Sequence, residues 1–204
     1  MIKLISEELL DGVTHDAQEN SRLRMNYNFH ESLDAPIHRL LNALEPGTYL
    51  PPHRHVDKEE TYIVLRGSLI AFFYDDMGNV TEKVNLNPSA GMYGVEIPSG
   101  TWHSIVVLES GTVIFEIKSG PYKPLPPEDV APWAPAPSDV EGAIIFMKRM
   151  LEVSFVPSNI RLRANMHAPT IPALSFNLEV VMTESLLTRF REYFRTAVLM
   201  GWVM

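Results

Sequence analysis

The chain of 204 residues contains no cysteine. This absence excludes a disulfide framework, a thiolate metal site and a cysteine nucleophile, so histidine and carboxylate groups would have to bind any metal. Basic residues are outnumbered by acidic ones and the net charge is −8, which disfavours binding to nucleic acid or to an anionic membrane surface. The chain also lacks a bilayer-length apolar run and a basic, apolar N-terminal signal. We therefore expect a soluble, cytoplasmic protein.

Strand-like segments dominate the first 120 residues. Residues 22–30 alternate strictly between polar and apolar side chains, which predicts a strand with two different faces. Turn residues separate the further strand-like runs, which are 37–44, 47–52, 60–74, 79–85, 93–97, 102–108 and 112–118. Many short strands at near-regular spacing predict an antiparallel sandwich or barrel. Residues 6–18 precede the strands as a predicted helix with Ser6 as its N-cap.

The chain changes character at residue 121. Segment 121–137 is rich in proline, so it can be neither a central strand nor a helix, and we interpret it as a stiff, extended strap. A helix is predicted next, because Ser138 and Glu141 have capping-box spacing before an apolar stripe. A second amphipathic helix is predicted over 183–204. The expected organisation is a β domain at 1–120, the strap at 121–137 and a helical extension at 138–204.

Potential metal ligands cluster in residues 47–67, GTYLPPHRHVDKEETYIVLRG. His53 and His55 are two residues apart, so on a strand both rings would lie on one face. Glu60 follows a short turn, and antiparallel pairing would return its carboxylate beside the two imidazoles. These groups suit a borderline divalent metal. The competing interpretation is a solvated hairpin with polar residues at its turn.

A second segment supplies another imidazole. Residues 98–103 read PSGTWH, in which proline and glycine form a turn and His103 stands on the strand that follows. With His103 the site would contain three histidines and one glutamate. A closed structural site would cover such a metal fully, whereas a barrel mouth would leave positions open for water or substrate.

These two segments resemble the signature motifs of the cupin superfamily. The first has the family's spacing of glycine, His-x-His, glutamate and glycine, and the second has its P-x-G-x-x-H pattern. The second departs from the usual pattern at Met92 and Val107, neither of which is a ligand position. The resemblance implies an all-β fold, a jelly-roll barrel with a short N-terminal helix and a C-terminal helical extension. It also implies one Fe, Mn, Ni or Zn ion, bound by His53, His55, Glu60 and His103.

A narrower resemblance involves residues 22–55, RLRMNYNFHESLDAPIHRLLNALEPGTYLPPHRH. This stretch is similar to the start of the WbuC-like cupin-fold metalloproteins, and the likeness covers roughly residues 1–150. Such proteins are often encoded among genes for surface-polysaccharide (O-antigen) synthesis. The resemblance implies a homodimer and a role in surface-polysaccharide metabolism.

The polar face of residues 22–30 has two interpretations. It is either a solvated strand face or a row of donors at the barrel mouth. Arginine binds carboxylate or phosphate with two parallel hydrogen bonds, and asparagine suits hydroxylated or carboxylated ligands. The candidate ligand-binding residues are Arg22, Arg24, Asn26, Asn28 and Arg39. Tyr62, on the face of Glu60, and His30 are the candidates for proton transfer.

The predicted function is that of a divalent-metal-binding cupin acting on a small sugar-like or carboxylated molecule. An enzyme of this kind would be a metal-dependent isomerase or epimerase, or an oxygenase. The alternative is a non-catalytic small-ligand sensor in which the metal is an anchor, and a third possibility is a purely structural metal. Cupin folds host all of these, so the fold alone does not choose among them.

Overall fold

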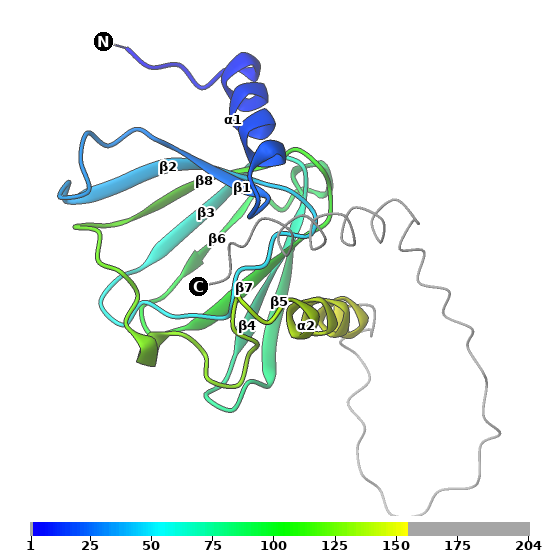
Figure 1. Ribbon diagram of the computed structural model, residues 1–204. Coiled ribbons are helices and arrows are strands. Elements are labelled where there is room, and N and C mark those ends of the chain that lie inside the picture. Colours follow the sequence, from blue (N-terminus) through cyan, green and yellow to red (C-terminus); the bar gives the residue numbers. More distant parts are fainter. Residues whose placement is uncertain (1, 155–204) are drawn as a thin grey trace, which may run out of the picture.

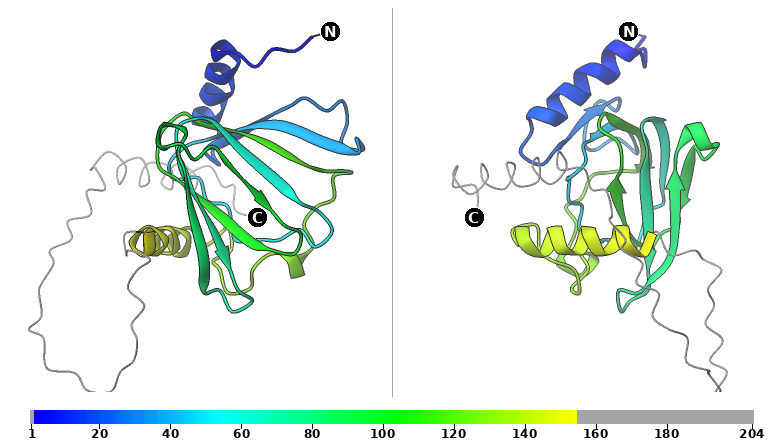
Figure 2. Two further views of the ribbon diagram at one scale, coloured as in Figure 1. Left: turned by 180° about the vertical axis from the view of Figure 1, so that it is seen from behind. Right: turned by 90° about the vertical axis from the view of Figure 1, so that its right-hand side faces the viewer.

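The computed structural model describes residues 2–154, which form two antiparallel sheets that face each other and a helix on the outer side of each (Figures 1 and 2). The first sheet has the order β1 (Arg24–Asn28), β2 (Ile37–Leu44), β8 (Thr112–Ser119), β3 (Glu60–Arg66) and β6 (Gly94–Ile97). The second has the order β5 (Val80–Leu86), β4 (Leu69–Tyr74) and β7 (Trp102–Val107). The predicted all-β class, with a helix at either end of it, is confirmed. Within the described residues the strands form two sheets rather than one closed ring.

Three apolar clusters follow from this layering. The first lies between the sheets and includes Val64, Leu69 and Ile105. The second covers the outer face of the β5-β4-β7 sheet, where α2 (Val140–Ser154) packs. The third covers the outer face of β1, β2 and β8, where α1 (Glu7–Glu19) packs. Alternating strand residues therefore serve different layers, as the two-residue period of a strand requires.

The first helix agrees closely with its sequence signals. Ser6 is the N-cap, and its hydroxyl oxygen accepts a hydrogen bond from the Leu9 amide at 3.4 Å. Leu10, Val13 and Ala17 form the buried face. Among residues 2–154 no helix is long and apolar enough to cross a membrane.

Several predicted elements need correction. Residues 47–52 contain no strand, because Pro51 and Pro52 have no N–H for a ladder. The run 60–74 is two strands, β3 and β4, with Gly67 between them at a φ of +77°. A Cβ at Gly67 would approach the Thr112 Cα to 2.8 Å, so only glycine fits this tight reversal.

The second helix begins on a different cap from the predicted one. Asp139, not Ser138, caps α2, and its Oδ1 accepts from the Gly142 amide at 3.0 Å. The helix predicted over 183–204 lies outside the described residues.

The proline-rich strap runs beside residues 49–54 and includes the 3-10 turn Pro127–Asp129. The Ala131 amide donates to the Pro52 carbonyl at 2.9 Å, and the Arg54 amide donates to the Asp129 carbonyl at 3.0 Å. These ladder-like bonds hold in place the chain segment that carries His53.

Candidate metal centre and adjoining pocket

Three ligand side chains converge between the two sheets. Ligand atoms of His53, Glu60 and His103 all lie within 4.8 Å of one another, and all three residues are buried. Glu60 is the first residue of β3, in one sheet, and His103 is on β7, in the other. His53 joins them because its amide donates to the His103 carbonyl at 3.0 Å and its carbonyl accepts from the His103 amide at 2.9 Å. This group could hold a metal ion.

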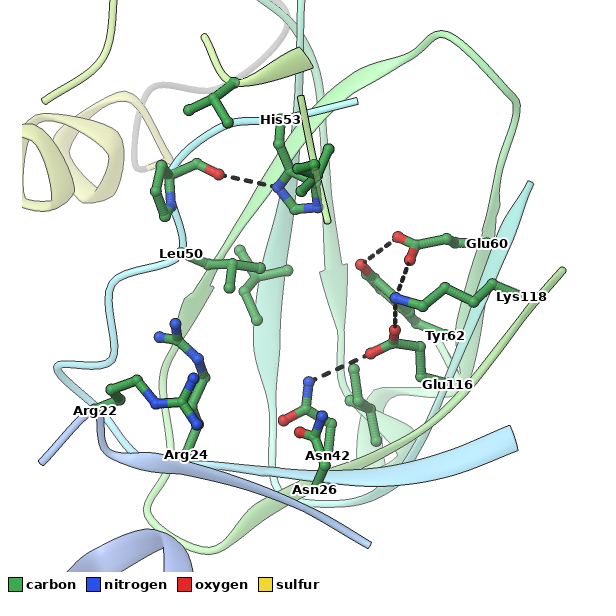
Figure 3. A pocket seen from close by; sticks show the side chains of 15 residues that line it. Arg22, Arg24, Asn26, Asn42, Leu50, His53, Glu60, Tyr62, Glu116 and Lys118 are labelled. Carbon is green, nitrogen blue, oxygen red and sulfur yellow. Dashed lines mark hydrogen bonds and ion pairs between the residues drawn. The ribbon is translucent and has the colours of Figure 1, made fainter. Parts of the chain in front are cut away.

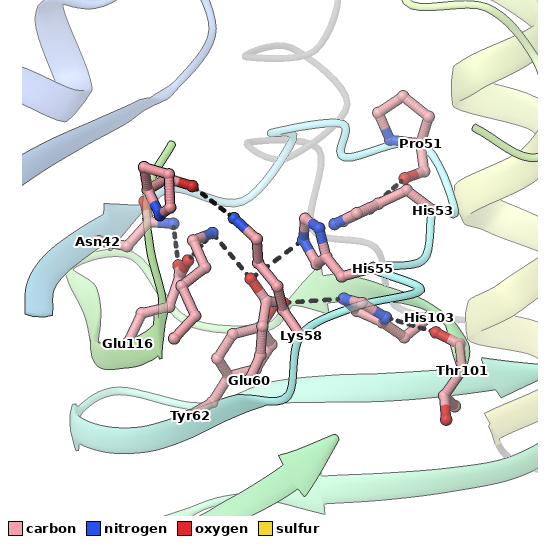
Figure 4. A network of polar contacts seen from close by, with 12 residues as sticks. Asn42, Pro51, His53, His55, Lys58, Glu60, Tyr62, Thr101, His103 and Glu116 are labelled. Atoms are coloured by element: carbon pink, nitrogen blue, oxygen red, sulfur yellow. Dashed lines mark hydrogen bonds and ion pairs between the residues drawn. The ribbon is translucent and has the colours of Figure 1, made fainter. Parts of the chain in front are cut away.

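The Glu60 carboxylate is the centre of the polar network (Figure 4). Its Oε2 accepts a hydrogen bond from the Tyr62 hydroxyl at 2.9 Å and lies 3.1 Å from Nε2 of His103. Its Oε1 accepts from the Lys118 ammonium at 2.8 Å and lies 3.2 Å from Nε2 of His55. Both oxygens of a buried carboxylate are thus in polar contact, as burial of its charge requires.

Backbone carbonyls fix the orientation of two of the rings. Nδ1 of His53 lies 3.0 Å from the Pro51 carbonyl, and Nδ1 of His103 lies 2.9 Å from the Thr101 carbonyl. A carbonyl oxygen only accepts, so each Nδ1 carries a proton, and Nε2 is the ring nitrogen left to bind a metal. Burial lowers the pKa of His53 to about 3, so this ring is neutral at ordinary pH. The arrangement is the one metal-ligating histidines use.

His55 supplies the fourth predicted ligand. Its Nε2 is buried and has no hydrogen-bond partner among the described residues, although the Glu60 Oε1 atom is close. A cation between the imidazole nitrogen and the carboxylate would satisfy both groups. Three imidazole nitrogens and a carboxylate oxygen are a donor set for a borderline divalent metal, and the residues present fit such an ion.

Charge balance around Glu60 keeps it ionised. Burial on its own would raise the pKa of Glu60, but the contacts with His103 and His55 and the charge of Lys118 outweigh burial and hold the pKa well below its usual range. Burial opposes the charge of Lys118 in turn, but Glu116 and Glu60 raise the pKa of this lysine above its usual value. The site therefore contains an anionic ligand residue and a cation beside it.

A cavity of about 310 Å³ opens next to the cluster (Figure 3). His53, Glu60 and Tyr62 lie on its wall, as do three members of the predicted polar face, Arg22, Arg24 and Asn26. The other lining residues are Asn42, Glu116, Lys118, Leu50, Pro51, Ile105, Ile114, Leu125 and Val130. Three members of the predicted polar face therefore lie at the cavity wall.

Three predicted residues do not line the cavity. Asn28 is exposed near the end of β1. His30 is buried and stacks on His38, with ring centroids 4.2 Å apart, and its Nδ1 lies 3.1 Å from the Arg39 carbonyl. Arg39 is exposed and, by strand alternation, lies on the face of β2 opposite the cavity. The roles predicted for these three residues stay predictions.

Sequence reasoning missed three polar lining residues, Asn42, Glu116 and Lys118. The Lys118 ammonium donates to Oε1 of Glu116 at 2.5 Å, and the Asn42 amide donates to Oε2 of Glu116 at 3.3 Å. Glu116 and Lys118 lie directly opposite Tyr62 and Glu60 in the pairing of β8 with β3. The alternation of residues 112–119 places the two charges on one face of a strand, and this signal could have found them.

The fold and the site together define a two-sheet antiparallel β protein with a candidate histidine–carboxylate metal centre. The family described as "Domain of unknown function (DUF6016)" matches residues 5–86, a segment that includes His53, His55 and Glu60. A search of curated proteins finds no match.

The chain is also similar to several solved structures. KdgF from Halomonas sp. is 19% identical, with a TM-score of 0.40, and the match covers 49% of this chain and 82% of that one. A cupin-2 domain containing protein from Shewanella frigidimarina is 22% identical, with a TM-score of 0.37 and coverages of 47% and 80%. L-ribose isomerase from Cellulomonas parahominis is 16% identical, with a TM-score of 0.40. This last match covers 52% of this chain and 65% of the isomerase, less than two thirds of its length.

Proposed function

We propose that this protein is a divalent-metal-binding cupin that acts on a small sugar-like or carboxylated molecule. The observation that carries the proposal is the convergence of His53, Glu60 and His103 at a cavity wall, with the unpartnered Nε2 of His55 beside them. His55 and the other three residues would hold the metal.

The chain's own residues supply binding and proton transfer around that ion. A bound divalent metal would polarise a substrate oxygen or activate water or dioxygen. The Tyr62 hydroxyl lies on the cavity wall, and burial, followed by the charge of Glu60, raises its pKa. Tyr62 therefore keeps its proton, which it donates in a hydrogen bond to Oε2 of Glu60, and the hydroxyl would have to turn from Glu60 to donate it to a ligand atom in the cavity. Lys118 holds the Glu60 carboxylate in place through Oε1.

The reaction class remains part of the proposal. An isomerase or epimerase would use the polarised oxygen and the Tyr62 proton, and an oxygenase would use the metal with dioxygen. The role in surface-polysaccharide metabolism is supported by the resemblance of residues 22–55 to the WbuC-like proteins. A homodimer is proposed on the same resemblance.

Elemental analysis of protein purified without added metal or chelator tests the metal centre. We expect one equivalent of a single transition metal in the wild-type chain, a sharp loss in His55→Ala, and no loss in His15→Ala. His15 is an exposed histidine of α1 and is a matched control. No metal after reloading, or equal retention in both variants, would overturn the assignment.

Catalysis and simple binding are distinguished by a second measurement. The metal-loaded protein is incubated with nucleotide-sugars and keto-sugars, with and without oxygen, and product formation is followed. Turnover supports the enzyme. Saturable binding without product supports the alternative, in which the cavity senses a ligand and the metal anchors it.

A further inference from the structure

Charge is unevenly distributed around the cavity wall. Lys118 is paired with both Glu60 and Glu116, at 2.8 and 2.5 Å, so these three charged groups neutralise one another in part at the metal end. The other two charged lining residues are both cationic, Arg22 and Arg24 (Figure 3). In a protein of net charge −8, an end of a cavity that presents two guanidinium groups is a local positive site.

Partly buried hydrogen bonds hold this cationic end of the cavity in place. Arg24 donates from Nη1 to the Thr48 hydroxyl at 3.1 Å and to the Tyr49 carbonyl at 2.9 Å. The same Thr48 hydroxyl donates to the Arg22 carbonyl at 2.8 Å, and Thr48 is only 2% exposed. Thr48 therefore contacts the guanidinium of Arg24 and the backbone of Arg22 at the same point of the wall. A guanidinium group held in this way favours a planar or tetrahedral oxyanion, and the exposed Arg22 lines the same cavity.

A second feature of the wall is an unused acceptor. Glu116 accepts from Asn42 through Oε2, and a carboxylate without a proton cannot donate, so the amide nitrogen of Asn42 must face Glu116. Its amide oxygen, Oδ1, is then fixed on the other side, and it is buried with no hydrogen-bond partner among the described residues. Buried polar atoms in folded proteins are normally paired. A hydroxyl or amino group of a ligand in the cavity would supply the missing donor.

We infer that the cavity selects a small hydroxylated acid, with the acid group at Arg22 and Arg24 and a hydroxyl group donating to Oδ1 of Asn42. The acid therefore binds away from the candidate metal centre, and the opposite end of the ligand faces the centre. Apolar side chains between the two ends, including Leu50 and Ile114, contact the carbon chain. The inference rests on the proposed function only in taking this cavity as the substrate site.

Three six-carbon probes separate the two recognition features. D-Gluconate carries both a carboxylate and hydroxyl groups, hexanoate carries the carboxylate alone, and D-glucitol carries the hydroxyl groups alone. Calorimetric titration of the full chain, metal-loaded and metal-free, should show gluconate binding at least about tenfold more tightly than either single-feature probe. Metal content is measured before and after each titration.

Two variants assign the features to residues. Arg22→Gln, at an exposed position, should bring gluconate down to the affinity of glucitol. Asn42→Ala should bring gluconate down to the affinity of hexanoate. Arg149→Gln, at an exposed position of α2, and Asn85→Ala, at an exposed position of β5, are the matched controls and should bind gluconate like the wild type.

The outcomes separate this inference from the proposed function. Equal affinity for gluconate and either other probe, or no gluconate binding at all, would overturn the inference. The metal content, measured separately, would still test the proposed metal centre. Discrimination that persists in a protein that never binds metal would support the inference and would count against the proposed metal function.

Discussion

Glu60 shows what a single buried carboxylate requires. It is 2% exposed, and the removal of its charge from water is offset by contacts with Tyr62, His103, His55 and Lys118. Breaking a buried pair by deleting one partner usually costs more than the pair contributes, because an uncompensated charge remains. The same carboxylate is the candidate metal ligand, so Lys118 and a metal ion compete for its charge.

Lys118→Met tests this competition. We expect the free energy of unfolding of the metal-free protein to fall by about 3 kcal/mol, because Glu60 and Glu116 lose their shared cation. Divalent metal should raise the melting temperature of the variant by more than that of the wild type, because metal then supplies the missing charge. Urea denaturation and thermal melts with and without metal measure both effects.

The control for this comparison is Lys148→Met, at an exposed position of α2. It should change stability by no more than about 0.5 kcal/mol. Equal stability of the Lys118 and Lys148 variants, with equal shifts on adding metal, would contradict the role given to Lys118.

At the scale of elements, one side chain ties α1 to the sheet. Arg66, at the end of β3, donates to Asp11 at 2.6 Å and to the Thr14 hydroxyl at 2.7 Å on the helix. It also donates to the Leu10 carbonyl and the Gly111 carbonyl, each at 3.1 Å. The rigid fork of guanidinium donors serves several acceptors at once, which a lysine cannot do.

Arg66→Met should therefore lower the free energy of unfolding by about 2 kcal/mol, and Arg66→Lys by less, as measured by urea denaturation. Metal content should stay at the wild-type level in both variants, because α1 packs on the face of the sheet that is opposite the centre. A loss in Arg66→Met with no loss in Arg66→Lys would show that charge alone, rather than the fork geometry, holds the helix.

The proline-rich strap lies beside the segment that carries His53 and positions that segment. Asp129 is 4% exposed, its Oδ1 accepts from Nε of Arg54 at 3.0 Å, and the Arg54 guanidinium lies over the Trp102 ring. Val130, the next residue, pairs with His53 in a short bridge. Asp129 is not a candidate ligand, but loss of its carboxylate should make the position of the His53 ring less well fixed.

Asp129→Ala is expected to weaken metal binding by about tenfold, the lower end of the range for residues that orient a ligand. Competition with a chromophoric chelator measures the dissociation constant. Glu128→Ala is the matched control, because Glu128 is the exposed neighbour in the same turn. An unchanged dissociation constant in the Asp129 variant would mean that the strap does not position the centre.

The sequence predicted those elements whose signals are local. Polar and apolar side chains alternate over residues 24–28, Ser6 caps α1, and prolines exclude a helix or central strand from the strap. Each of these signals acts within a few residues of the chain. Lys118 and Glu116 were missed because two charges on one face of a strand usually mean a solvated face. Their importance depends on the register that sets them opposite Glu60 and Tyr62, which only the assembled sheet defines.

At the scale of the whole molecule, the candidate metal centre lies between the two sheets. Glu60 comes from the start of β3 in one sheet, and His103 comes from β7 in the other. The three apolar clusters are built from residues between Leu9 and Leu151. The candidate ligands and the lining of the cavity fall between Arg22 and Val130. The described core and site thus lie within residues 9–151, and residues 155–204 lie outside the described range.

A chain ending at residue 154 is thus expected to unfold cooperatively and to bind the same amount of metal as the full chain, by thermal melting and elemental analysis. A chain ending at residue 137 is the contrasting control, because it also loses α2. Met147 and Met150 are buried in that helix, and Met150 packs in the cluster with Trp102, so this second deletion exposes the outer face of the β5-β4-β7 sheet. It should melt at a markedly lower temperature or aggregate. Loss of the cooperative transition or of metal already in the 154-residue chain would show that residues 155–204 complete the fold rather than extend it.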